Sequence, residues 1–137
     1  MKKSVRDASS QGRSILVAAD DPTTLAVLVS SLKTAGHKVR SANSAEGVVA
    51  AMHLELPDLL VLHPGGRLSG GSLYRRLLAD GRTGATPILV VAHPTAVATF
   101  NSRPRADYFL AKPVKLSALN ARLEALVTAP QAIGAAA

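Results

Sequence analysis

Runs of consecutive apolar residues alternate along this chain with segments in which apolar residues recur every three or four positions. Three runs with few polar residues are typical of strands buried on both faces of a sheet: 14–19, 58–63 and 87–92. Two shorter segments, 38–42 and 107–111, are also expected to be strands. The pattern therefore predicts five strands, with helical segments between and after them.

The first helix is expected to have Asp21 as its N-cap, Pro22 at its first position and Gly36 as its stop. Ser44 is expected to cap the second helix, and Gly81 to stop the third. After residue 93 the helical signal is weak, and a proline at 104 interrupts it, so a weak or irregular fourth helix is predicted. Helical spacing predicts these inward-facing residues: Leu25, Leu28, Val29, Leu32, Val48, Val49, Met52, Leu73, Leu77, Leu78, Leu116, Leu119, Leu123 and Leu126.

Strands that alternate with helices predict a parallel sheet with helices on both faces, a doubly wound α/β sandwich. In such folds the functional site lies beyond the carboxyl ends of the strands, near the switch in strand order. This rule selects a small set of candidate site residues from the sequence: Asp20, Asp21, His63, Ala92, His93 and Lys112.

The length of 137 residues fits one domain, expected at 14–128, and a hydrophobic content of 47% supplies a core. Residues 1–13 are expected to be a flexible basic arm and residues 129–137 a frayed tail. The arm holds four basic residues and one acidic residue, so it carries almost half of the net charge of +7. The rest of the chain is only mildly basic, which permits an acidic partner without requiring one.

Several classes of function are disfavoured by composition. Cysteine is absent, which excludes disulfides, thiolate zinc sites and a cysteine nucleophile. Only two tyrosines, two phenylalanines and no tryptophan are present, so few aromatic side chains could stack on nucleic-acid bases. The apolar runs are too short to cross a bilayer and no signal peptide is recognised, so a cytoplasmic protein without a membrane partner is expected.

Four blocks, in order and at matching spacing, resemble the receiver domain of two-component response regulators. They are Ile15 to Pro22, Pro57 to His63, Pro87 to Ala92, and Phe109 to Pro113. The resemblance covers about residues 14–128. It implies a flavodoxin-like (βα)5 three-layer sandwich with strand order 2-1-3-4-5, and a pocket that in working relatives accepts phosphate on an aspartate.

The chain departs from that family at the residues that carry its chemistry. The acceptor position, at the end of the third strand, is His63. Of the two acids that help to hold magnesium after the first strand, one matches Ala19 and only Asp20 remains. The small hydroxyl residue that closes the fourth strand matches Ala92. An acyl phosphate needs a carboxylate nucleophile, so the resemblance implies a degenerate pocket and a pseudo-receiver without phosphorylation.

Other features of the family pocket are kept. Lys112 follows the fifth strand, Asp21 stands where many relatives also have an acid, and Phe109 occupies the position of the switch aromatic. Magnesium binding is expected to be lost or weak, because this cation prefers several oxygen ligands. No cofactor and no enzyme activity are expected. The expected role is binding to an unidentified signalling protein, or to a second copy through the family's fourth helix, fifth strand and fifth helix.

Two other classes of function stay open. A nucleic-acid-binding adaptor would use the basic arm and surface arginines, but no recognition helix or stacking motif supports it. A small flavodoxin-like enzyme or ligand carrier would need a convergent set of catalytic groups, and none can be assembled.

The candidate residues also have plain structural interpretations. Asp21 is expected to act mainly as a helix cap, and Asp20 could pair with Lys112 as a structural ion pair. His63 is either a plain strand-end histidine or a pH-dependent counter-ion beside Asp20. A transition-metal site of His63, His93 and Asp20 is a further, less favoured hypothesis. The glycine-rich stretch 65–71 lacks the features of a phosphate loop and is interpreted as a flexible connection, and the arginine pairs 75–76 and 103/105 as solvated faces.

Overall fold

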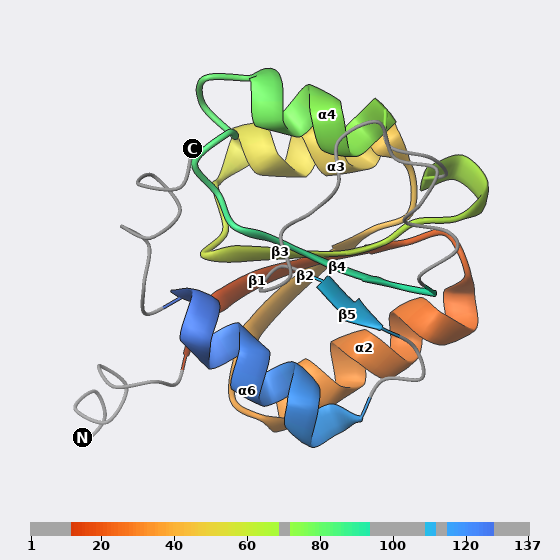
Figure 1. Cartoon of the computed structure of the whole chain (residues 1–137), viewed down its shortest axis with the longest axis vertical. Coiled ribbons are helices and arrows are strands. Elements are labelled where there is room, and N and C mark those ends of the chain that lie inside the picture. Colours follow the sequence, from red (N-terminus) through yellow and green to blue (C-terminus); the bar gives the residue numbers. More distant parts are fainter. Residues whose placement is uncertain (1–11, 69–71, 94–108, 112–114, 128–137) are drawn as a thin grey trace.

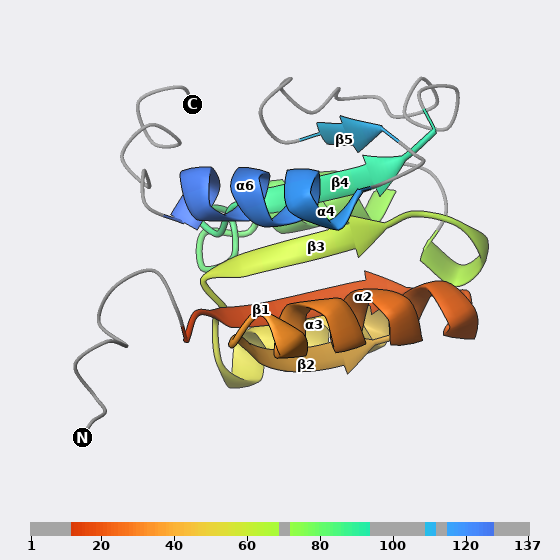
Figure 2. The same ribbon diagram turned by 90° about the horizontal axis from the view of Figure 1, so that it is seen from below.

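The computed structural model describes residues 12–68, 72–93, 109–111 and 115–127. Within them, five parallel strands form one sheet: β1 (Ser14–Ala19), β2 (Lys38–Ala42), β3 (Leu59–His63), β4 (Ile88–Ala92) and β5 (Phe109–Ala111). The strand order is β2-β1-β3-β4-β5, which confirms the order implied by the resemblance. Figure 2 shows the strands pointing the same way, so their carboxyl ends share one edge of the sheet.

Helices cover both faces of this sheet. Figure 1 shows α3 (Ala45–Leu54) and α4 (Ser72–Ala79) on one face, and α2 (Pro22–Thr34) and α6 (Leu116–Val127) on the other. This arrangement confirms the three-layer sandwich. The weak fourth helix was predicted for a stretch that includes Pro104, and residues 94–108 lie outside the described residues, as do residues 1–11 of the arm and the whole tail.

Local sequence signals explain where these helices begin and end. Asp21 is the N-cap of α2 with Pro22 at its first position, and Ser44 caps α3 by accepting a hydrogen bond from the Gly47 amide. Gly36 has a φ of +99° and follows the last turn of α2. There the His37 amide donates to the Leu32 carbonyl, the bond that closes this type of helix end.

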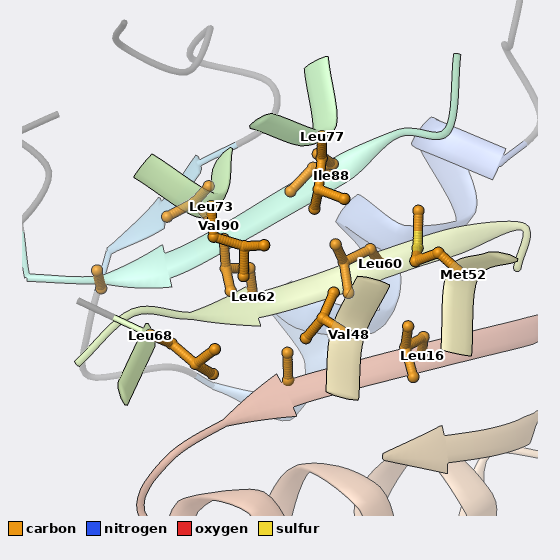
Figure 3. Close-up of a cluster of buried hydrophobic side chains, with 12 residues drawn as sticks. Leu16, Val48, Met52, Leu60, Leu62, Leu68, Leu73, Leu77, Ile88 and Val90 are labelled. Carbon is orange, nitrogen blue, oxygen red and sulfur yellow. The ribbon is translucent and has the colours of Figure 1, made fainter. Parts of the chain in front are cut away.

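Two buried clusters lie on opposite faces of the sheet because side chains alternate along each strand. Figure 3 shows the cluster under α3 and α4, which contains Leu60 and Leu62 of β3. Leu59 and Val61 of the same strand point to the other cluster, under α2 and α6. The prediction that Leu78 faces inward is wrong: its exposed fraction is 44%. Leu73 and Leu77 are one helical turn apart and buried, whereas the next residue is rotated by about 100° around the helix.

A polar cluster interrupts the second apolar layer near the start of β1 and β2. His37 is only 7% exposed, and its Nδ1 atom makes no hydrogen bond within the described part of the chain. Burial lowers the pKa of His37, and the charge of Arg13 acts in the same direction, whereas Glu124 of α6 opposes both. The folded state therefore favours the neutral form of the His37 imidazole.

We expect this histidine to make stability depend on pH. Because its pKa is lower in the folded chain than the ordinary 6.5, the unfolded chain binds more protons as the pH falls through that value. The free energy of unfolding should therefore decrease below about pH 6.5, by at most about 1.4 kcal/mol per pH unit from this group. Urea denaturation at several pH values measures this slope.

The slope should flatten in His37→Gln and remain in His93→Gln, whose side chain is exposed. Asp21 and Asp80 have pKa values lowered below 3.8, so they do not titrate in the pH range around 6.5 in which His37 acts. An unchanged slope in His37→Gln would contradict the assignment.

Candidate functional site

The carboxyl edge of the sheet brings together residues that are far apart in the sequence. His63 at the end of β3 is the register partner of Ala19 at the end of β1, and Asp20 follows directly. Ala92 at the end of β4 is paired with Ala111 of β5. The predicted juxtaposition of Asp20 and His63 at one edge is therefore confirmed at the level of the strand register. Lys112 lies outside the described residues, and only the backbone of Phe109 is described, within β5.

Asp21 caps the amino end of α2. Its Oδ2 atom accepts hydrogen bonds from the Thr24 amide at 3.0 Å and from the Thr24 hydroxyl at 2.6 Å. These bonds, led by the one from the hydroxyl, lower the pKa of the exposed Asp21 carboxyl, and the charge of nearby His63 adds a smaller effect. The interpretation of Asp21 as a helix cap is confirmed.

Asp20 is half-buried and lies against the turn that follows β3. In this turn Gly65 and Gly66 have φ values of +151° and +52°, which favour glycine, and the Leu68 amide donates to the Gly65 carbonyl. A Cβ atom on Gly66 would lie 2.7 Å from Cγ of Asp20 and nearer still to Oδ2. The carboxyl group of Asp20 therefore packs directly on the glycine backbone.

This turn corrects part of the interpretation of residues 65–71 as a flexible connection. Gly66–Leu68 form a 3-10 turn, and Leu68 is 2% exposed within the cluster under α3 and α4. The buried Leu68 anchors the turn, so the turn has a fixed position and its glycines allow the backbone to lie close to Asp20. Residues 69–71 lie outside the described part.

The remaining candidates differ in exposure. Ala92 is 3% exposed and offers no hydroxyl, whereas His63 is half-buried and His93 exposed. Arg75 and Arg76 are exposed on α4, which confirms their interpretation as a solvated face, and Arg103 and Arg105 lie outside the described residues.

The magnesium ion that the resemblance implies does not fit this set of donors. Magnesium prefers oxygen ligands, carboxylates above all, and two of the three positions that match family acids hold the methyl group of Ala19 and the imidazole of His63, so only Asp20 keeps a carboxylate. The Asp21 carboxylate already accepts both Thr24 donors. Among residues 12–68, 72–93, 109–111 and 115–127, no group of three or more histidine, aspartate or glutamate side chains could hold a metal ion. The structure thus does not assemble His63, His93 and Asp20 as a transition-metal site.

Two features of the structure were missed by sequence reasoning. The contact of Gly66 with Asp20 could have been suspected from two adjacent glycines that begin two residues after the end of a strand. A cavity at the opposite edge of the sheet left no recognisable signal, because its lining comes from three separate segments. No helix within the described ranges is long and apolar enough to cross a membrane.

Comparisons with known proteins agree with this architecture. No protein-family model matches the chain, and no curated protein matches it. Among solved structures, the signal receiver domain of a histidine kinase from Syntrophus aciditrophicus has a TM-score of 0.75 and 23% identity, over 85% of this chain and 91% of that one.

Two response regulators are also similar. One from Chloroflexus aurantiacus J-10-fl has a TM-score of 0.71 and 26% identity, covering 86% of this chain and 99% of its own. The chemotaxis response regulator CheY4 of Vibrio cholerae has a TM-score of 0.70 and 16% identity, covering 85% and 99%. The chain therefore has the flavodoxin-like fold of response regulator receiver domains.

Proposed function

We propose that this chain is a receiver-like signalling module that works without phosphorylation, by binding a protein partner in a two-component or phosphorelay pathway. The fold shared with receiver domains of a histidine kinase and of response regulators supports the signalling role. A cytoplasmic location and the absence of enzyme activity are part of the proposal.

One observation carries the loss of phosphorylation: the sheet register places His63 beside Ala19 at the edge where the resemblance puts the acceptor and a magnesium ligand. A mixed anhydride forms on a carboxylate, and neither residue has one. The buried Ala92 removes the third part, the hydroxyl that would contact the phosphoryl group. Three parts of one mechanism are missing together.

Binding to a partner is the output that remains for such a module. The family's surface of fourth helix, fifth strand and fifth helix corresponds here to the segment after β4, β5 itself and α6. Partner binding, or pairing with a second copy, through this surface is part of the proposal. Since no phosphoryl group switches the pocket, the partner should bind equally well with and without a phosphodonor.

Incubation with acetyl phosphate and magnesium, followed by intact mass measurement, tests the proposal. No phosphoryl increment is expected, in contrast to an active receiver treated in parallel. A stable increment would overturn it, and His63→Gln would then show whether the imidazole itself had been phosphorylated. Capture of partners from the source cell, with and without acetyl phosphate, should give the same bound proteins.

A further inference from the structure

A cavity of about 300 Å³ lies at the edge of the sheet opposite to the carboxyl edge just described. Its walls come from the segment before β3, the segment before β4 and the C-terminal end of α6. Figure 2 shows that α6 ends at the side of the sheet where β3 and β4 begin. Residues of all three segments line it, among them Leu56, Asp58, Arg82, Ala85, Leu126 and Val127.

Hydrogen bonds hold two of the three walls in place, the segment before β3 and the turn before β4. The Asp58 amide donates to the Ser14 carbonyl at 2.7 Å, and Asp58 Oδ2 accepts from the Ser14 amide at 2.9 Å. The turn that carries Arg82 is fixed by Asp80, whose Oδ1 atom accepts the Arg82 amide at 2.7 Å and the Thr83 amide at 3.3 Å. A site that is already ordered loses less conformational entropy when a ligand binds.

Among the described residues that line the cavity, one is a cation, Arg82, and one is an anion, Asp58, and they do not form an ion pair. Arg82 is exposed, and within the described part of the chain its backbone amide bonds to Asp80 while its guanidinium has no ion pair. Asp58 uses one carboxylate oxygen to hold the start of β1. Leu56, 39% exposed, and the buried Leu126 supply apolar lining.

We propose that this cavity binds a small monocarboxylate with an apolar body. The carboxylate pairs with the guanidinium of Arg82, which matches its geometry with two parallel donors. The apolar body lies against Leu56 and Leu126. The nearby charge of Asp58 disfavours a second negative group, so dicarboxylates and phosphates bind less well. A free organic acid and the carboxyl terminus of a peptide present the same chemistry.

This inference is independent of the proposed function. The cavity lies at the amino ends of β3 and β4, whereas His63 and Ala92 are at their carboxyl ends. Either proposal can fail without affecting the other.

Nitrogen-edited NMR titration of the whole chain with hexanoate tests the inference. We expect saturable shifts of the backbone amides of Leu56, Ala85 and Val127, and none at His63. Acetate lacks the apolar body, hexanamide lacks the charge and adipate adds a second carboxylate, so all three should bind more weakly. Arg82→Gln should weaken hexanoate binding about tenfold or more. Arg76→Gln, which removes an exposed arginine that does not line the cavity, should leave it unchanged.

Two short peptides that end in leucine, one with a free carboxyl terminus and one amidated, distinguish the two sources. Binding of the free-carboxylate peptide that depends on Arg82, with hexanoate silent, supports the inference with a peptide as the source. Binding of both hexanoate and the free-carboxylate peptide supports the inference for any such carboxylate. The inference would be overturned if neither of these two probes binds, or if they bind Arg82→Gln as tightly as the original chain.

Discussion

Truncation of Leu60 to alanine should lower the free energy of unfolding by about 2–5 kcal/mol. Leu60 is fully buried in β3, the central strand of the sheet. Its register partners, Leu16 of β1 and Ile88 of β4, are buried in the same cluster (Figure 3). The flanking strands are tied to β3 by hydrogen bonds, so they cannot move in to fill the space, and most of the cavity should remain.

Urea denaturation followed by circular dichroism measures this loss. A small domain has a total stability of about 5–15 kcal/mol, so the variant should lose a large fraction of it. Leu54→Ala is the matched control, because this leucine at the end of α3 is 83% exposed. It should change stability by no more than about 0.5 kcal/mol. Equal effects of the two truncations would contradict the described core.

The buried strands were predictable because strands of a parallel sheet that are covered on both faces have nearly unbroken apolar sequences. β3 and β4 fall within the predicted runs 58–63 and 87–92. The start of α2 was predictable because Asp21 and Pro22 are strong local signals. The strand order came from the family resemblance, since periodicity does not say which strands are neighbours.

Side-chain direction in short helices was less predictable. Leu77 and Leu78 are both apolar and adjacent, so the sequence pattern accepts either as inward-facing. The packing decides: Leu77 aligns with Leu73 toward the sheet, and Leu78 is left 44% exposed. This choice depends on the rotation of α4 against the sheet, which is a tertiary property.

For the candidate site, the sequence predicted which residues lie at the carboxyl ends of the strands. The rule for parallel sheets placed Asp20 and His63 at one edge, and the register confirms it. The capping role of Asp21 was predictable, but the contact of Asp20 was not, because its neighbour is the backbone of a turn that is distant in the sequence. The engagement of Asp21 by Thr24 is local, whereas the contact of Asp20 with Gly66 joins segments more than forty residues apart. The predicted roles of Lys112 and Phe109 stay predictions.

Replacement of Gly66 by alanine is the change expected to perturb this edge most. The φ of +52° disfavours any residue with a Cβ atom by about 1–2 kcal/mol. The new methyl group would also collide with the Asp20 carboxyl group, whose Cγ is only 2.7 Å from the Cβ position. Together these effects should destabilise the chain by about 1–3 kcal/mol, measured by urea denaturation.

Two other glycines separate the causes of this loss. Gly65→Ala introduces backbone strain without a collision, since φ is +151° and no atom lies within 4 Å of its Cβ position. Gly81→Ala has neither strain nor collision, because its φ lies outside the positive region and its Cβ position is open. It should be neutral or slightly stabilising, by up to about 1 kcal/mol.

A double-mutant cycle with Asp20→Ala then isolates the contact itself. Asp20→Ala removes the colliding carboxyl group, so Gly66→Ala should cost at least about 0.5 kcal/mol less in that background than in the original chain. Other interactions of Asp20 cancel in the cycle, and the backbone strain at residue 66 remains in both arms. Zero coupling energy would mean that the turn does not press on the carboxyl group. A clear coupling would show that the chain's own backbone in the turn after β3 occupies the space beside the Asp20 carboxyl group, at the edge of the sheet that also holds His63 and Ala92.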